Sequence, residues 1–260
     1  MTEKTRDANW AGSFFGGPRD FYGTTYTRFG RLPKDPEKEI DGVLALLKPE
    51  PGSHILDWCG GWGRHAIPLA KRGFRVTILD FSAKYLERAR EHAEREGVEI
   101  TTVCADFRDT PPHIQADYAV NLFTAGLGYF GEEDDIVALK RLFAALKPDA
   151  KVLIDTISLF WIVKNFRGHN WEETADGRGR FLHKRTFDFG TNTERAINTH
   201  QDLDKGTEET ANVELKLYCP ADLARILKSA GFVPQELYGG FDGSGFNFDA
   251  KRVVMLAGRP

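Results

Sequence analysis

The sequence predicts an α/β fold: a doubly wound, mostly parallel seven-stranded sheet with helices on both faces. Three observations support this prediction. Strand-like apolar runs alternate with helical patterns up to about residue 155. A glycine-rich turn at residues 59–63 separates the first apolar run from a helical stretch, as in the nucleotide pockets of open sheets. Acidic residues follow three successive strand-like runs.

The N-terminal segment, residues 1–35, is rich in aromatic residues and glycine and has no regular period, so we expect an N-terminal cap or lid. Residues 36–260 are expected to form the main domain. Its first helix begins at Asp35-Pro36, because Asp is a good N-cap and Pro is favoured at the first helical position. Apolar residues then recur with helical spacing over residues 40–47.

Strands and helices alternate through the next part of the chain. Ser82 is expected to cap a helix over 83–96, and a second amphipathic helix is expected over 134–146. The strand-like runs lie at 55–56, 74–79, 98–103, 118–123 and 151–155.

The pattern changes after residue 155. Residues 156–170 have a helical pattern, and polar and apolar positions then alternate from about 170 to 218. Asp176-Gly177 and Asp204-Lys205-Gly206 are typical hairpin turns, so we expect an inserted antiparallel sheet here. The earlier pattern resumes with an expected helix at 220–230 and expected strands at 233–238 and 252–257.

The acids Asp57, Asp80 and Asp106 each end a strand-like run, and the carboxyl ends of parallel strands share one edge of a sheet. Asp57 would repel a pyrophosphate, which prefers backbone amides and a helix N-terminus. It favours instead a nucleoside with a cationic group and no phosphate. Asp80 can accept hydrogen bonds from ribose hydroxyls, and Asp106 from an adenine amine.

Two alternative interpretations of this edge remain. Each acid can be an ordinary N-cap of the helix that follows it. Gly61-x-Gly63-x-x-Ala66 also satisfies the dinucleotide fingerprint, with Asp80 at the distance of a ribose-binding acid. The second alternative predicts an NAD-dependent oxidoreductase on the same glycine turn.

The stretch from about Ser53 to Lys147 resembles the class I S-adenosylmethionine (SAM)-dependent methyltransferases, in a branch that acts on small molecules. The chain differs at Cys59, where the family usually has a glycine; Cys59 is small, so we expect the turn to survive with Gly60 taking some of the strain. The motifs that carry the resemblance are Leu56–Gly63 for the first motif, Leu79–Ser82 for ribose, Ala105–Phe107 for adenine, and Leu146–Asp155 for the turn into the fifth strand.

The resemblance implies SAM as cofactor, with S-adenosylhomocysteine as product. Tyr22 and Tyr26 resemble cap tyrosines that touch the methionine end of SAM; the alternative is that they only pack. The expected cofactor-binding residues are Asp57, Cys59, Gly60, Gly61, Gly63, Asp80, Phe81, Asp106, Phe107, Asn121, Tyr22 and Tyr26.

Methyl transfer is a direct displacement that depends on alignment and exclusion of water, with a general base as an optional aid. The candidate catalytic residues are His200 and Tyr129, expected in the insert and after the fourth strand. In the alternative, His200 is a strand histidine whose hydrogen bonds are already made within the protein. Tyr129 then only lines the wall of the pocket and takes no part in the chemistry. Two further alternatives keep SAM: a binding module without catalysis, and an enzyme that uses the aminopropyl group of SAM.

The composition of the chain restricts the kinds of molecule that the protein is expected to bind. A net charge of −3 and a pI near 6.2 give no electrostatic footprint for nucleic acid, and residues 121–124 lack the prolines of nucleic-acid amino-methylating enzymes. Three cysteines and seven histidines show no metal-ligand spacing, so we expect no metal. Without a signal peptide or a membrane-spanning run, we expect a cytoplasmic monomer or homodimer that acts on a small molecule.

Overall fold

In the computed structural model, the described residues are 10–17, 20–23, 35–174 and 176–260. The chain divides into two compact units, each of which is described by itself. The larger unit comprises residues 35–165 and 217–260. The smaller unit comprises residues 1–34 and 166–216.

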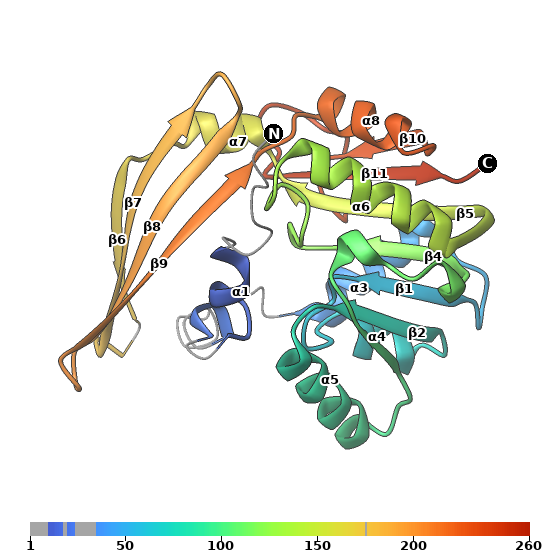
Figure 1. Cartoon of the computed structure of the whole chain (residues 1–260), viewed down its shortest axis with the longest axis horizontal. Coiled ribbons are helices and arrows are strands. Elements are labelled where there is room, and N and C mark those ends of the chain that lie inside the picture. The colour runs from blue at the N-terminus through green and yellow to red at the C-terminus, as the bar shows by residue number, and fades with distance from the viewer. Residues whose placement is uncertain (1–9, 18–19, 24–34, 175) are drawn as a thin grey trace, which may run out of the picture. The chain divides into compact units, whose positions relative to one another are not determined.

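The larger unit is built on one seven-stranded sheet with the strand order β10-β11-β5-β4-β1-β2-β3 (Figure 1). The first five strands in the chain pair in parallel, whereas β11 runs antiparallel to both β5 and β10. The predicted fold class is thus confirmed. The strands are β1 (His54–Trp58), β2 (Arg75–Asp80), β3 (Thr101–Cys104), β4 (Ala116–Asn121), β5 (Leu146–Ile157), β10 (Val233–Tyr238) and β11 (Arg252–Gly258).

Helices cover both faces of this sheet because successive side chains of each strand point to opposite sides. In β1, Ile55 belongs to the apolar cluster that includes residues of α3, α4 and α5, and Leu56 to the cluster that includes residues of α6 and α8. The helices of this unit are α3 (Pro36–Leu47), α4 (Ala66–Lys71), α5 (Ala83–Glu96), α6 (Glu132–Ala145), α7 (Leu159–Lys164) and α8 (Pro220–Ser229), with short 3-10 turns η1 (Phe107–Asp109) and η2 (Pro112–Ile114).

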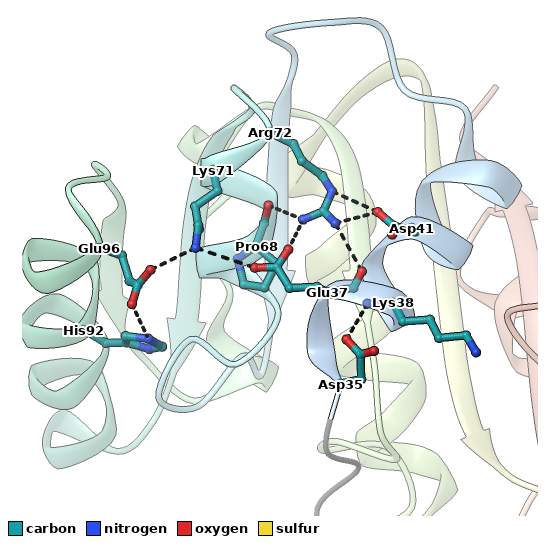
Figure 2. Close-up of polar contacts among 9 residues, drawn as sticks. All are labelled: Asp35, Glu37, Lys38, Asp41, Pro68, Lys71, Arg72, His92 and Glu96. Atoms are coloured by element: carbon teal, nitrogen blue, oxygen red, sulfur yellow. Dashed lines mark hydrogen bonds and ion pairs between the residues drawn. The ribbon is translucent and has the colours of Figure 1, made fainter.

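Charged side chains join the first three of these helices on the protein surface (Figure 2). The Arg72 guanidinium donates to the carboxylates of Glu37 and Asp41, and the Lys71 ammonium donates to Glu96 at 2.9 Å. These contacts connect the end of α4 to α3 and α5. Exposed ion pairs contribute little stability individually, so the apolar clusters hold the layers together.

The smaller unit contains a four-stranded antiparallel sheet with the order β6-β7-β8-β9, which confirms the predicted antiparallel insert. Helix α1 (Trp10–Phe14) contacts β9, and Phe14, Phe21 and Phe181 form an apolar cluster that packs against Ala211 and Val213. The strands are β6 (His169–Glu173), β7 (Gly179–Asp188), β8 (Thr193–Asp202) and β9 (Thr207–Lys216).

One expected element is shorter than predicted. The helical pattern of residues 156–170 gives only α7, and β6 begins already at His169. Strand β5 extends to Ile157, where Arg252 of β11 is its pairing partner. The pairing with β11 therefore keeps the first residues of the predicted helix in the sheet.

A buried hydrogen bond connects the starts of α6 and α8. The Tyr218 hydroxyl donates to Oδ2 of Asp135 at 2.5 Å, and the Gly128 N–H donates to the same oxygen at 2.8 Å. Both side chains are buried. Burial, followed by the charge of Asp135, raises the pKa of Tyr218 far above its ordinary value, so the hydroxyl stays a donor.

We expect Tyr218→Phe to lower the free energy of unfolding by about 2 kcal/mol, because Asp135 loses a hydrogen bond in a site that water does not reach. Urea denaturation measures this. Tyr238→Phe is the control, since its hydroxyl bonds to Glu236 at the surface and should change stability by less than about 0.5 kcal/mol. Equal effects of the two substitutions would contradict a stabilising role of the buried hydrogen bond from Tyr218 to Asp135.

Candidate functional site

The site begins with Asp57 in β1, whose carboxylate lies directly against the backbone of the glycine turn. A Cβ added to Gly60 would lie 2.5 Å from the Asp57 carboxyl carbon, so any larger residue at this position would force the Asp57 carboxylate to move. Asp57 is 1% exposed, and its Oδ2 is buried without a hydrogen-bond partner among the described residues. A carboxylate oxygen without a protein partner in this place is suited to a ligand that donates hydrogen bonds or carries positive charge.

The turn after β1 contains a left-handed residue that is not glycine. Cys59 has φ of 66°, and Gly61 and Gly63 also have positive φ. The expectation that Gly60 takes the strain at this departure is therefore wrong, because Cys59 itself adopts the conformation for which the family usually has glycine. The N–H groups of Cys59 and Gly60 both donate to the Leu79 carbonyl, which fixes the turn to β2.

Asp80 ends β2 and holds the other side of the turn. Its Oδ2 accepts from the Gly61 N–H at 3.0 Å, and its Oδ1 accepts from the Ser82 N–H at 2.9 Å. The side chain is 7% exposed. Asp80 thus fixes both the glycine turn and the start of α5, and each oxygen keeps a further lone pair.

Burial dominates the electrostatics of these two acids. It raises the pKa of Asp57 to about 6, although nearby His65, the Ala66 N–H and Arg64 lower it. Burial likewise raises the pKa of Asp80 to about 6; the Ser82 and Gly61 N–H groups oppose the shift, and the charge of Asp57 adds to it. The site therefore disfavours its own negative charge until a cation neutralises it.

The third acid, Asp106, comes after β3 and is paired. The Arg108 guanidinium donates to both of its oxygens, at 2.9 and 2.6 Å, and lies over the Phe130 ring. Phe107 is buried against Trp58 and Phe130. The core encloses most of this ring, and the expected role of Phe107 in cofactor binding stays a prediction. Phe81, 43% exposed beside Asp80, is the more accessible phenylalanine.

Asn121 and Tyr129 lie near the end of β4. The buried Asn121 amide donates to the Trp58 carbonyl at 2.8 Å and to the Ala125 carbonyl at 2.9 Å. The Asn121 amide thus connects the end of β1 to the loop after β4, and its expected role in cofactor binding stays a prediction. The Tyr129 hydroxyl donates to the Thr124 carbonyl at 2.8 Å, so this candidate base is held within its own loop.

The remaining predicted residues belong to the smaller unit. Tyr22 packs against Phe14 and Phe15, and His200 is buried in β8, paired in register with Phe181 and Glu209. Tyr26 lies outside the described residues. Their expected roles stay predictions.

Four residues that were not predicted as site residues lie near the ends of β4, β5 and β11: Phe123, Thr124, Asp155 and Arg252. The Arg252 guanidinium donates to both oxygens of Asp155, at 2.7 and 2.6 Å. Asp155 in turn accepts from the backbone of Phe123 and Thr124. Asp155 lies near the end of the apolar β5, so the signal that identified the other three acids was present there as well.

Within the part of the chain that the structure describes, no cluster of histidine, cysteine or acidic residues is suited to hold a metal ion. Among the same residues, no helix is long and apolar enough to cross a membrane.

Comparison with known proteins finds methyltransferases among the similar sequences. Residues 55–149 match the family model described as "Methyltransferase domain". A glycine/sarcosine N-methyltransferase of Aphanothece halophytica is 33% identical over 119 residues, 45% of each chain. A tRNA 5-carboxymethoxyuridine methyltransferase of Escherichia coli K12 is 32% identical over 132 residues, 50% of this chain and 49% of that protein. The chain thus spans about half the length of the curated relatives it matches.

A solved structure, SAM-bound CalS10 from Micromonospora echinaspora, is described as an amino pentose methyltransferase. It superposes with a TM-score of 0.68 at 19% identity and covers 92% of this chain and 97% of its own. This likeness shows the same fold. The resemblance to class I SAM-dependent methyltransferases is confirmed, with the family match on residues 55–149.

We expect a specific pH dependence from Asp57. A carboxyl whose pKa is about 6 in the folded state and 3.8 when unfolded binds protons preferentially when folded, so its contribution to stability rises as pH falls through 6. Relative to Asp57→Asn, the ligand-free protein should gain about 1 kcal/mol between about pH 7.5 and about pH 5. Urea denaturation at both pH values measures the difference. A difference that does not change with pH would contradict the shift.

Proposed function

We propose that this protein is a SAM-dependent methyltransferase that acts on a small molecule. The observation that carries the proposal is the pair of buried acids at the glycine turn, Asp57 and Asp80, each with a pKa raised to about 6. A cationic nucleoside without phosphates relieves the cost of their charges, whereas the pyrophosphate of NAD adds negative charge beside them. The NAD-dependent alternative is therefore disfavoured.

The residues present fit this cofactor. The Oδ2 of Asp57 has no hydrogen-bond partner among the described residues and is suited to a cationic group, and the lone pairs of Asp80 are suited to ribose hydroxyls. Asp106 and the half-exposed Phe81 are assigned to the adenine end. SAM would supply a methyl group on a sulfonium: a nitrogen, oxygen or carbon nucleophile would form a bond to the methyl carbon as the carbon–sulfur bond breaks and S-adenosylhomocysteine leaves as the thioether. The protein's part is to hold the reactants in line and to exclude water.

The relatives' names support a small acceptor. One is named for glycine and sarcosine, and a structure with the same fold for an amino pentose. The net charge of −3 also disfavours a polyanion. His200 and Tyr129 stay the candidate bases, and recognition of the acceptor is assigned to the N-terminal segment and the sheet β6–β9.

A second candidate acceptor is RNA, because one relative is named as a tRNA methyltransferase. A mobility-shift assay with total tRNA in the presence of S-adenosylhomocysteine separates the two candidates. No shift at about 0.15 M salt is expected, since the formal charge gives no basic footprint. Salt-sensitive binding would favour RNA. Mass analysis of the products distinguishes methyl transfer from aminopropyl chemistry, which leaves methylthioadenosine.

We expect Asp80→Ala to weaken S-adenosylhomocysteine binding by about tenfold or more in calorimetry, because the ribose loses two hydrogen bonds. Asp117→Ala is the matched control. That carboxylate also accepts a backbone N–H, from His54 at 2.9 Å, but at the amino end of the strands. Asp117→Ala should leave the affinity unchanged. Wild-type affinity in Asp80→Ala, or binding of NADH alone by the wild type, would contradict the proposal.

A further inference from the structure

The loop that follows β4 contains two consecutive residues in the left-handed region. Phe123 has φ of 65° and Thr124 has φ of 59°. Phenylalanine and β-branched threonine rarely adopt this conformation, because Cβ then crowds the backbone. Such residues persist only where their surroundings hold them, and they concentrate at functional sites.

The surroundings here are contacts from two strands, β5 and β11. Asp155 Oδ2 accepts from the Phe123 N–H at 2.8 Å, and the Asp155 carbonyl accepts from the Thr124 N–H at 3.0 Å. The Thr124 hydroxyl oxygen accepts from the Ile157 N–H at 2.9 Å. Arg252 of β11 holds both oxygens of Asp155. The ion pair is well shielded, with side-chain exposures of 21% for Arg252 and 2% for Asp155.

The same loop contacts the glycine turn. Asn121 donates both to Trp58, just before the turn, and to Ala125 within the loop. The Cys59 Sγ lies 2.8 Å from where a Cβ on Gly126 would be. The guanidinium groups of Arg64 and Arg252 both lie near the Phe123 ring, at 5.6 and 5.5 Å from its centre.

The strand order indicates which part of the cofactor lies beside the loop after β4. The order β4-β1-β2-β3 places the adenine acid after β3, the ribose acid at the end of β2, and the acid for the cationic end in β1. A SAM molecule laid across these strand ends carries its sulfonium toward β4. The loop after β4 then borders the part of the cofactor that carries the methyl group.

We propose that Asp155 and Arg252 are positioning residues: their ion pair fixes Phe123 and Thr124 in the left-handed conformation, and this loop forms the wall of the cofactor site beside the methyl group. The inference rests on the proposed function. A buried arginine–carboxylate pair adds little stability beyond its desolvation cost, but it specifies one geometry. The pair acts through the loop and does not itself contact the cofactor.

The test is Arg252→Lys, which keeps the charge but loses the planar fork that holds both oxygens of Asp155. Amide hydrogen exchange at Phe123 and Thr124 should become faster, because both N–H groups depend on Asp155. Calorimetry should show SAM binding weakened at least about fivefold and S-adenosylhomocysteine binding changed by less than about twofold, since only SAM has the methyl group that contacts the wall.

Arg72→Lys is the matched control. Arg72 is 24% exposed and also bonds to carboxylates, those of Glu37 and Asp41, but it joins helices at the surface (Figure 2). It should change neither exchange at Phe123 and Thr124 nor either affinity. If Arg252→Lys does not fold, Thr124→Val removes only the hydroxyl that accepts from Ile157, and the same SAM-selective loss is expected.

Two outcomes separate the proposals. Faster exchange at Phe123 and Thr124 with an unchanged ratio of SAM to S-adenosylhomocysteine affinity would overturn this inference alone, because the loop would then be released without bordering the methyl group. Failure of the wild type to bind either ligand would overturn the proposed function, and the inference with it.

Discussion

The site depends on the cost of burying two carboxylates, Asp57 and Asp80, at the ends of neighbouring parallel strands. Burial raises the pKa of both to about 6, and the charge of Asp57 adds to the shift at Asp80. The glycine turn is shaped around them: Gly60 leaves room for one carboxylate, and the Gly61 N–H donates to the other. An arrangement that costs free energy without a ligand is suited to a ligand that supplies positive charge.

The glycine turn also contacts the loop that follows β4. Cys59 takes a left-handed conformation in the turn that follows Asp57, and its sulfur lies close to Gly126. The left-handed pair Phe123–Thr124 lies in the same loop and is held by Asp155. Residues in the left-handed region thus follow both β1 and the neighbouring β4, as is typical of sites that are preorganised before a ligand binds.

The features that could be predicted from the sequence are those that local sequence patterns determine. Ser82 and Gly97 cap the helix 83–96 at both ends, so the predicted bounds agree with the structure. Asp57 and Asp80 lie at one sheet edge because alternation of strands and helices dictates parallel pairing. The left-handed loop was not predictable, because Asp155 and Arg252, 97 residues apart, hold it. The burial of Phe107 was not predictable either, because it depends on Trp58 and Phe130, which are distant in the sequence.

The most direct test of the central claim is the number of protons exchanged when S-adenosylhomocysteine binds at about pH 6. It is measured by calorimetry in two buffers of different ionisation enthalpy. The ligand's ammonium group should lower the pKa of Asp57 and Asp80, so we expect net release of about one proton, and markedly less in Asp57→Asn. No release, or net proton uptake, would contradict the claim that the two buried carboxylates select the cofactor.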